Sequence, residues 1–430
     1  MHSVHVPIQD VPVSRDGARP RVPQPALSLL AFMMAVGPFG DTEYTPALPS
    51  IAHALHADYD MVQFTMTSYL IGSSVSQLIY GPLSDRFGRR PLMLYGSLIL
   101  IAGSVLCMLS FSVGPLIAGR LLQGIGACAG GVIADAAVRD AFSADRRQRV
   151  YAKINAAFAV APAIGPVAGT YVERTPIGWH GNFAVLTLLA VALLWLVWRY
   201  LPETNLRLNR RALQPKRFWR NYRQVLVKRE FVFNAILSGC CIGIVYTALI
   251  GAPDLVINVL KRGSIGIIIV AISILIAFVI GAGSCAWLTR RIRHEWIIVA
   301  GLALLILASA ALLVVALWAG EKGTLAMFLA PIGVAFIGVG LVVPVTTAHA
   351  MAPFRQIAGA ASSMLGFVRM GVAALATLAM SLLHMGSVID IPIVFLVLTA
   401  LAVGLFVGYV TLYGRRDLAG PRHDVARSAA

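Results

Sequence analysis

Long uncharged stretches dominate the pattern of polar and apolar positions along this chain. Eleven stretches of 19 or more residues contain no Asp, Glu, Lys or Arg: 22–40, 61–84, 91–119, 154–172, 175–198, 231–253, 263–289, 296–320, 323–354, 370–389 and 391–414. A twelfth, 116–138, is interrupted only by Arg120 and Asp135. Because a helix needs about 20 mostly apolar residues to cross the hydrocarbon core of a bilayer, the pattern predicts a polytopic helical membrane protein.

Twelve transmembrane helices follow from these stretches. We expect them near residues 26–49, 61–83, 91–111, 115–138, 149–172, 181–201, 231–257, 264–289, 296–318, 324–350, 357–383 and 391–413. Most connections are short, so neighbouring helices should pack antiparallel. The predicted fold class is all-α integral membrane, with 12 transmembrane helices in two six-helix halves.

The longest polar segment, Pro202–Glu230, divides the chain in two. It separates an N-terminal six-helix half, 26–201, from a C-terminal six-helix half, 231–413, and we interpret it as a basic cytoplasmic linker. Residues 1–25 and 414–430 are predicted to be cytoplasmic tails. Two halves joined in this way are typical of transporters built from parallel repeats, whose binding site lies near the midplane between the halves.

Composition and charge support a membrane location. Of the 430 residues, 58% are hydrophobic and 13% charged, whereas a soluble domain carries about a quarter charged residues. The formal charge is +16, and with the N-terminus inside, 29 Lys and Arg lie in inner segments, 4 in outer ones and 2 within spans. Since this bias sets membrane topology, the basicity is explained without nucleic-acid binding, and both termini are predicted to be cytoplasmic.

Signatures of metal, ATP and common enzyme chemistry are missing from the sequence. All five cysteines fall inside apolar spans, and no Cys/His spacing predicts a metal site. The chain has no P-loop, no GxSxG elbow and no HExxH motif. We therefore expect no cofactor, no metal and no enzymatic activity. A non-transporting membrane enzyme is the alternative from another functional class.

The strongest local motif is the turn after the second predicted helix, Gly81-Pro-Leu-Ser-Asp-Arg-Phe-Gly-Arg-Arg-Pro91. Glycines allow a tight turn between helices, an aspartate complements a positive helix N-terminus, and arginines anchor the inner membrane edge. This run closely resembles the loop 2–3 signature of the major facilitator superfamily. The resemblance implies a gate that stabilises one access state, formed here by Gly81, Asp85, Arg86, Gly88, Arg89 and Arg90.

Two further segments resemble motifs of the same superfamily. Arg120–Ala127 is similar to its helix 4 motif, whose arginine is linked to proton coupling. Ala161–Gly169 is similar to the helix 5 motif of proton-coupled exporters, although Thr170 stands where a glycine is usual. The residues implied for this antiporter motif are Pro162, Gly165, Pro166 and Gly169.

Two proline-containing segments narrow the resemblance. Thr45–Pro49 closes the first predicted helix and Leu201–Thr204 closes the sixth. Both resemble the Bcr/CflA-type branch of twelve-helix drug/proton antiporters.

The helix 5 segment, Ala161–Gly169, also has a purely structural interpretation. Its prolines can kink the helix and its small residues allow close approach to a neighbour, so a packing seam explains the residues of the antiporter motif as well.

Charged residues inside spans carry the candidate chemistry. A cation in hydrocarbon is costly and usually faces a bundle interior or a watery cavity. Gln123 and Asp135 share roughly one helical face with Arg120, which predicts a polar stripe along a path. Asp135 lies four residues before Arg139 and can instead form an interfacial pair with it.

The first predicted helix holds two carboxylates, Asp41 and Glu43, just before Pro46. Two residues apart on a helix they point about 200° away from each other, so one of them faces the cavity unless the helix unwinds at the prolines. In Bcr/CflA-like chains an acid normally stands four positions before this proline, where Thr42 stands here. The resemblance therefore does not choose between Asp41 and Glu43 as proton carrier, and Asp135 is held in reserve. Both helix 1 acids can also lie solvated at the outer interface.

A second departure from the family lies in the eleventh predicted helix. Gly359–Met370 resembles the family's helix 11 segment, but a glutamine is more usual at Arg369. An arginine there indicates an anionic substrate group or a fixed internal ion pair. The predicted cavity residues are Thr42, Tyr44, Tyr69, Gln123, Phe158, Tyr246, Met364 and Arg369, although helix packing explains the aromatic and methionine residues equally well.

The resemblance implies a proton-coupled secondary active exporter of drugs or other small molecules that works by alternating access in a bacterial inner membrane. Its partners are expected to be protons, a small-molecule substrate and the bilayer, with the proton gradient as energy source and a monomer as the working unit. Export of an endogenous anionic metabolite or siderophore is the alternative within transport. An importer is also compatible with the fold.

Overall fold

The computed structural model describes residues 22–206, 208–210, 212–261, 263, 265–354, 357–383 and 388–413. The predicted tail 414–430 and all but the last four residues of the predicted tail 1–25 lie outside the described residues.

Helices make up the regular structure of the described chain. They are α1 Leu27–Thr42, η1 Thr45–Ala47, α2 Leu48–Ala54, α3 Tyr59–Phe87, α4 Arg89–Met108, α5 Val113–Ala141, α6 Ala144–Glu173, α7 His180–Tyr200, α8 Pro215–Leu226, α9 Arg229–Pro253, η2 Asp254–Val259, α10 Ile265–Leu288, α11 His294–Ala319, η3 Gly320–Lys322, α12 Leu325–Met351, α13 Ala358–Leu383 and α14 Asp390–Tyr413.

Ten of the described helices are long and apolar enough to cross a membrane. They are α4 to α7 and α9 to α14. Of the other two predicted spans, α1 has 16 residues because it is broken, whereas α3 has 29 residues but carries many buried polar side chains. Both lie inside the bundle, α1 against α5 and α6, and α3 against α5 and α13. The chain is therefore the multi-pass, all-helical membrane protein that the sequence predicts.

The main departure from the predicted elements is the break in the first span, predicted as one helix over 26–49. The α-helix ends at Thr42, and a short 3₁₀ turn precedes α2. Pro46 has no backbone N–H, so it cannot donate to the carbonyl four residues earlier, and Pro49 restricts the chain again. The chain therefore unwinds at Glu43 and Tyr44, between the end of α1 and the prolines.

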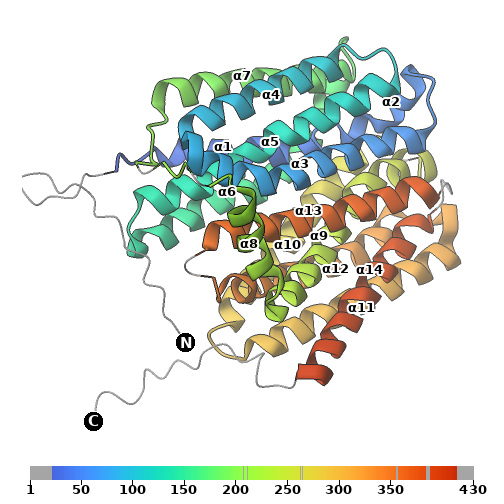
Figure 1. The fold of residues 1–430 in the computed structure, drawn as a ribbon. Helices are drawn as coiled ribbons and strands as arrows, with labels where there is room; N and C mark the ends of the chain where they lie inside the picture. Colours follow the sequence, from blue (N-terminus) through green and yellow to red (C-terminus); the bar gives the residue numbers. More distant parts are fainter. Residues whose placement is uncertain are drawn as a thin grey trace, which may run out of the picture.

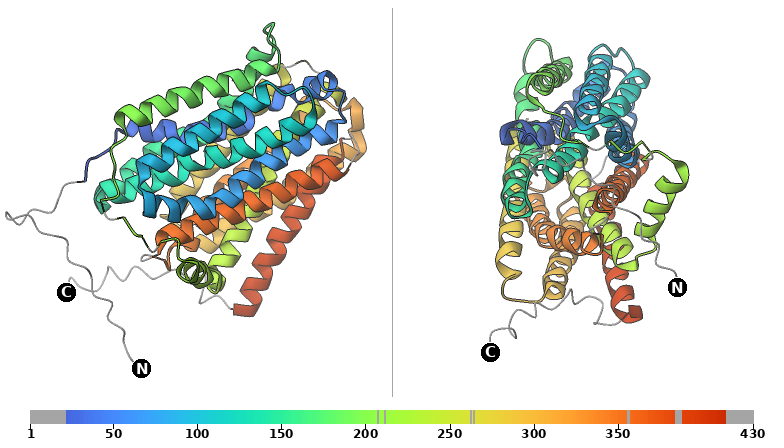
Figure 2. Two further views of the ribbon diagram at one scale, coloured as in Figure 1. Left: turned by 45° about the horizontal axis from the view of Figure 1, so that its top comes forward. Right: turned by 60° about the vertical axis from the view of Figure 1, so that its left-hand side comes forward.

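The bundle has two groups of helices. Figure 1 shows α1 to α7, coloured blue to green, above α9 to α14, coloured yellow to red. Two pairs make the closest contacts between the groups, α3 with α13 and α6 with α10. The remaining helix, α8, lies outside the bundle against α13 and α9, as the two views in Figure 2 also show.

One end of the bundle, called here the basic end, carries α8, the Asp85–Arg90 turn and the 289–293 turn. At this end Tyr222 of α8 donates its hydroxyl to the carbonyl oxygen of Leu78 in α3 at 2.7 Å and also hydrogen-bonds Ser363 of α13. Burial raises the pKa of Tyr222 to about 12, so it is a neutral donor at ordinary pH. One side chain of α8 thus touches both groups of helices.

The apolar core differs between the two ends of the bundle. At the end opposite the basic end, one continuous cluster joins the groups; it includes Leu48 and Met66 from the first and Leu249 and Val256 from the second. Toward the basic end each group also has an apolar cluster of its own, one drawn from α1 and α3 to α7 and one from α8, α9, α12 and α13. The core shared by both groups therefore lies toward the opposite end.

Candidate functional site

A cavity of about 1410 Å³ lies between the two groups of helices. Its lining reaches from Asp41 and Tyr246 near the middle of the bundle to Asp85 and Arg220 at the basic end. The lining residues of each long helix come from its middle or from the part nearer the basic end. Together with the continuous core at the opposite end, this lining places the opening of the cavity at the basic end.

The guanidinium of Arg120, on α5, caps the broken end of α1. Its Nη1 donates to the carbonyl oxygen of Gly40 at 2.9 Å, and its Nη2 reaches the carbonyl oxygen of Asp41 at 3.5 Å. The last carbonyls of a helix have no partner within the helix and carry partial negative charge. The carbonyl of Thr42 accepts from the hydroxyl of Thr45 at 2.8 Å. Side chains thus satisfy the carbonyls that the break releases.

Aromatic rings and an amide complete the surroundings of Arg120. Its guanidinium carbon lies 4.0 Å from the ring centre of Tyr44 and 4.4 Å from that of Tyr69, and such faces attract cations. Nη1 also donates to Gln123 Oε1 at 2.8 Å, and Gln123 Nε2 donates to the hydroxyl of Ser104 at 2.9 Å. Among the ion pairs of the described chain, none involves Arg120. Dipoles and ring faces therefore compensate this buried charge.

Asp41 connects the two groups of helices at the deep end of the cavity. Its carboxyl is 4% exposed, and Oδ2 accepts a hydrogen bond from the hydroxyl of Tyr246 on α9 at 2.6 Å. The other oxygen, Oδ1, has no hydrogen-bond partner in the described chain. Asp41 thus belongs both to the capped end of α1 and to the cavity wall.

Glu43 lies two residues further on and is 1% exposed. It does not line the cavity, and neither carboxyl oxygen has a hydrogen-bond partner among the described residues. A carboxylate in these surroundings would be a buried charge that no hydrogen bond stabilises, although Arg120 is near enough to attract it. Of the two helix 1 acids, only Asp41 meets the cavity.

The small residues of α6 pack directly on the broken segment of α1. A Cβ placed on Gly165 would overlap with the hydroxyl of Thr42 and one on Gly169 with the carbonyl oxygen of Glu43. Thr42 itself donates to the carbonyl oxygen of Pro38 at 3.0 Å. Pro162 and Pro166 lie on the same helix, α6. The predicted antiporter segment is therefore in contact with the segment that holds both carboxylates.

Asp135 lies on α5 far from Arg120. Fifteen residues of α-helix span about 22 Å, and Asp135 lines the cavity nearer the basic end. It interacts electrostatically with Arg139, one turn further along the helix, and its backbone carbonyl accepts from the hydroxyl of Tyr151 at 3.2 Å. The structure therefore does not bring Asp135 together with Arg120 and Asp41.

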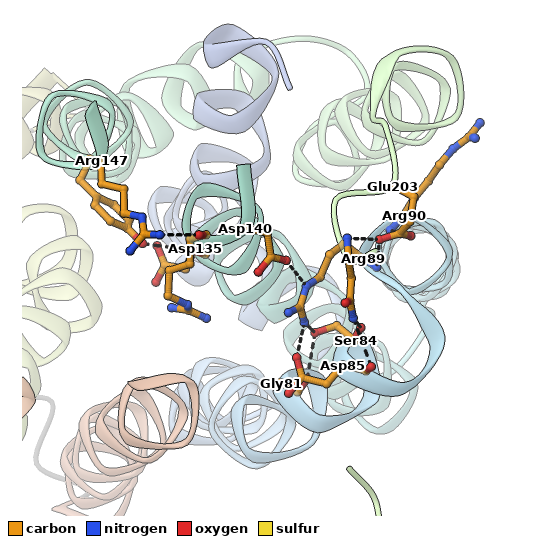
Figure 3. Close-up of polar contacts among 12 residues, drawn as sticks. Gly81, Ser84, Asp85, Arg89, Arg90, Asp135, Asp140, Arg147 and Glu203 are labelled. Carbon is orange, nitrogen blue, oxygen red and sulfur yellow. Dashed lines mark hydrogen bonds and ion pairs between the residues drawn. The ribbon is translucent and has the colours of Figure 1, made fainter. Parts of the chain in front are cut away.

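The Asp85–Arg90 turn is held by a dense polar network. Arg89 forms ion pairs with Asp85 at 2.7 Å and with Asp140 of α5 at 3.0 Å, and it also donates to the hydroxyl of Ser84. Figure 3 shows these groups gathered around one guanidinium. Gly88 has a φ of 100°, which favours glycine.

A carboxylate caps the helix that follows this turn. Glu203 accepts hydrogen bonds from the backbone N–H groups of Arg89 at 2.9 Å and Arg90 at 3.1 Å, at the N-terminus of α4. A helix N-terminus stabilises negative charge. Arg86 lies beside the ring of Phe87, 5.1 Å from its centre.

The bonds of this turn stay within the first group of helices and the segment that follows it. In the described chain, the hydrogen bonds and ion pairs of Asp85, Arg89 and Arg90 go to residues before position 210. Gly81, one helical turn before Asp85 on α3, lies close to the other group, since a Cβ there would lie 3.0 Å from the hydroxyl of Ser363.

Arg369, on α13, lines the cavity from the second group of helices. It is half-buried, and its Nε donates to the hydroxyl of Ser238 on α9 at 2.6 Å, while Nη2 donates to the hydroxyl of Thr347 on α12. The ion pairs of the described chain do not include Arg369. The predicted internal ion pair is therefore not formed here.

The predicted cavity residues divide into two sets. Tyr69, Phe158, Tyr246 and Arg369 line the cavity. Thr42, Tyr44, Gln123 and Met364 do not, because they pack against neighbouring helices instead.

Several residues that shape the site were not predicted. Ser238 and Thr347 hold Arg369, and Asp140 holds Arg89; their sequence surroundings carry no distinguishing pattern. Glu203 lies in the Leu201–Thr204 segment that the sequence singled out, but its pairing with the N-terminus of α4 depends on the fold.

Comparisons with known proteins agree with this architecture. The sequence profile of the Major Facilitator Superfamily matches residues 27–377. A chloramphenicol resistance protein of Pseudomonas aeruginosa is 29% identical over 389 residues, which cover 88% of this chain and 90% of the relative. Multidrug resistance protein D of Escherichia coli strain K12 is 29% identical over 344 residues, which cover 79% and 84%.

The fold is also similar to solved structures. A bacterial homologue of the human lysosomal transporter Spinster, in an inward-facing and unoccupied conformation, matches with a TM-score of 0.71 at 13% identity. The match covers 88% of this chain and 95% of that one.

Proposed function

The chain belongs to the Major Facilitator Superfamily, and we propose that within this family of transporters it is a proton-coupled exporter of small organic molecules. It is a multi-pass membrane protein that carries a small-molecule substrate and is not an enzyme. Its homologues include drug-resistance proteins, which supports export as the direction of transport.

The position of Asp41 carries the proposal. Its carboxyl lies at the deep end of the cavity, adjoins the segment that Arg120 caps, and accepts a hydrogen bond from Tyr246 of the other group of helices. An ionised Asp41 can only accept a hydrogen bond from Tyr246, whereas a protonated Asp41 is itself a donor. Protonation therefore changes the hydrogen bond between the two side chains. Proton binding at Asp41 is thereby linked to the contact between the two groups.

The direction of the cavity supports an alternating-access cycle. Basic loops face the cytoplasm in membrane proteins, so we assign the basic end to the cytoplasm and describe this structure as inward-open. Substrate enters from the cytoplasm, and the halves 26–201 and 231–413 then rock about the 202–230 linker until the cavity opens outside. Protons from outside load Asp41 and drive the return to the inward-open state.

The Asp85–Arg90 turn acts as a gate in this proposal. In the inward-open state its bonds hold α3, α4 and α5 together at the mouth of the cavity. Closing the mouth brings this turn against the C-terminal half, where it stabilises the other access state. Replacement of Asp85 by asparagine should therefore slow turnover without preventing substrate binding.

The test compares the two helix 1 acids in inverted membrane vesicles. The vesicles are acidified inside, and a pH-sensitive dye reports proton release on adding cationic, neutral and anionic organic compounds. Wild type and Glu43→Gln should release protons with at least one compound, whereas Asp41→Asn should not. Asp58→Asn, an exposed acid at the opposite end of the bundle, is the matched control. Proton release by Asp41→Asn equal to wild type would remove Asp41 from the mechanism.

We place the working protein in the bacterial inner membrane as a monomer, with both termini in the cytoplasm. One bundle contains the cavity, Asp41 and the turn, so one chain suffices for a cycle. Crosslinking in native membranes tests this: a crosslinked dimer that alone transports would contradict it.

A further inference from the structure

We propose that Arg369, with Ser238 and Thr347, forms a binding site for the acidic group of the substrate, so that the exported molecules are small amphipathic organic acids. This proposal deepens the proposed function and rests on it for the role of the cavity. It names the substrate class by the chemistry that the cavity wall presents.

The guanidinium of Arg369 is held in place by two hydrogen bonds, and some of its N–H donors remain unpaired among the described residues. Two hydroxyls from two different helices accept from its Nε and Nη2. Its other terminal nitrogen, Nη1, has no hydrogen-bond partner in the described chain and is not sealed from the cavity. A planar guanidinium offers N–H groups as a fork that matches a carboxylate or phosphate. The fixed plane of Arg369 therefore presents free donors to a ligand in the cavity.

The charges that line the cavity favour a negative ligand. Among the described residues, the wall holds five arginines and three aspartates, and no other ionised residue type. Arg89 is paired with Asp85, and Asp41 is bonded to Tyr246. An intramembrane cation without a counter-charge is costly, so an anion that binds Arg369 recovers interaction energy that the protein does not supply.

The wall that adjoins α13 offers neutral polar groups from the other half. Ser73 and Gln77 of α3 line the same cavity. Gln77 packs against Gly366, one turn before Arg369 on α13, so closely that a Cβ on Gly366 would overlap with the Gln77 amide. Hydroxyl and amide groups can donate to an acid without adding charge. A ligand acid held by Arg369 thus lies at the seam between α3 and α13.

The rest of the lining near the middle of the bundle suits an apolar body. Tyr69, Phe158, Phe278 and Met370 share the wall with Arg369. Ligand sites combine mostly apolar and aromatic lining with few polar groups, and a methionine adapts to varied shapes. The expected ligand therefore has one acidic group and an aromatic or aliphatic body.

The test uses matched acids and amides on the purified full-length protein in detergent at neutral pH, without any gradient. The probes are benzoate with benzamide and 1-naphthoate with 1-naphthamide, and calorimetry measures their dissociation constants. In wild type at least one acid should bind about tenfold more tightly than its amide, a preference of about 1.4 kcal/mol. In Arg369→Gln the preference should vanish while amide affinity stays within about twofold.

Two variants keep the test decisive. Arg369→Lys retains the charge but not the fork, so it should keep part of the preference, and it serves if Arg369→Gln does not fold. Arg291→Gln removes an exposed arginine that does not line the cavity and should bind as wild type does. The absence of acid preference in both probe pairs, or its persistence in Arg369→Gln, would overturn the proposal.

Failure of this proposal is distinguishable from failure of the proposed function. The binding measurement needs no proton gradient and does not depend on Asp41. Acid preference that depends on Arg369, together with unchanged proton release in Asp41→Asn, would keep the acid site and reject the coupling role. Proton release that depends on Asp41, together with equal binding of acids and amides, would keep the coupling role and reject the acid site.

Discussion

Arg120 and Arg369 are both arginines inside the membrane bundle, and in the described chain neither forms an ion pair. They are held in opposite ways. Arg120 has no exposed surface and contacts carbonyls, an amide and two aromatic rings. Arg369 lines the cavity, and two side-chain hydroxyls accept from it.

The difference separates two uses of a costly cation. At Arg120 the guanidinium serves the backbone, because the broken end of α1 leaves the carbonyls of Gly40 and Asp41 without a helical partner and Arg120 donates to both. At Arg369 the hydroxyls could bond elsewhere; Thr347 already donates to the carbonyl of Val343. The first arginine therefore maintains the fold around Asp41, whereas the second is available to a ligand.

The largest effect should come from replacing Arg120. In Arg120→Gln the carbonyls of Gly40 and Asp41 lose their donor, and each buried acceptor left alone costs about 1–3 kcal/mol. We expect transport to be abolished and the free energy of unfolding to fall by about 2–6 kcal/mol, which is the cost for two acceptors. Arg120→Lys should not restore transport, since one ammonium cannot reproduce the planar fork.

Arg369→Gln provides the contrast for this measurement. Its free energy of unfolding, followed by denaturant titration in detergent, should stay within about 1 kcal/mol of wild type, because cavity water replaces the lost donor. Equal destabilisation by the two arginine variants would show that both are structural and would end the comparison.

The sequence predicts the importance of Arg120 but not its role. The cost of a cation in hydrocarbon indicates a residue that faces the bundle interior. It does not reveal that the partners are the carbonyls of Gly40 and Asp41, because these become available only where α1 breaks. The predicted stripe from Arg120 to Asp135 does not line one path here: Asp135 lines the cavity, whereas Arg120 and Gln123 do not. Arg120 and Asp135 also lie about 22 Å apart along α5.

The choice between Asp41 and Glu43 also depends on the fold. Their opposite directions on a helix follow from the sequence, as does the possibility of unwinding at the prolines. Which acid meets the cavity depends on the packing of α6. Its glycines lie against Thr42 and Glu43, whereas Asp41 faces Tyr246 and accepts its hydrogen bond. Ten of the predicted spans, by contrast, need only length and apolar composition, and these are local properties of the chain.

The next effect in size should come from Gly169→Ala. A Cβ at this position overlaps with the backbone of Glu43, and overpacking costs about 1–3 kcal/mol. The strain displaces the segment that Arg120 caps. If about 1.4 kcal/mol of this strain energy raises the barrier to transport, the rate of proton release should fall about tenfold. Acid binding at Arg369, on the other half, should change little.

Gly333→Ala is the matched control, because a Cβ added to this α12 glycine would meet no described atom within 4 Å. It should transport as wild type does. If Gly169→Ala also transports normally, close packing of α6 on α1 is not needed for coupling. If it loses acid binding as well, the two arginine sites are not independent.

A further effect should appear in the response to membrane potential. Exchange of one entering proton for one departing monovalent anion moves two charges, whereas a neutral amide moves one and a monovalent cation none. Each charge is worth about 2.3 kcal/mol per 100 mV. At zero pH gradient, a potassium diffusion potential that is negative on the cytoplasmic side should therefore speed the export of naphthoate more than that of naphthamide. Equal responses would argue against an anionic substrate exchanged for one proton.

The smallest effects should come from the hydroxyls that orient Arg369. Ser238→Ala and Thr347→Val each remove one acceptor, and water in the cavity can take its place, so acid affinity should weaken by about two- to fivefold, or about 0.5–1 kcal/mol. Ser309→Ala, which removes a buried hydroxyl bonded to Thr399 at 3.0 Å away from the cavity, is the control. The double variant Ser238→Ala/Thr347→Val frees the guanidinium from both helices and should approach, without reaching, the loss in Arg369→Gln. A double variant that binds naphthoate as wild type does would mean that the guanidinium needs no orientation, and the contrast with the tightly held Arg120 would then rest on exposure to the cavity alone.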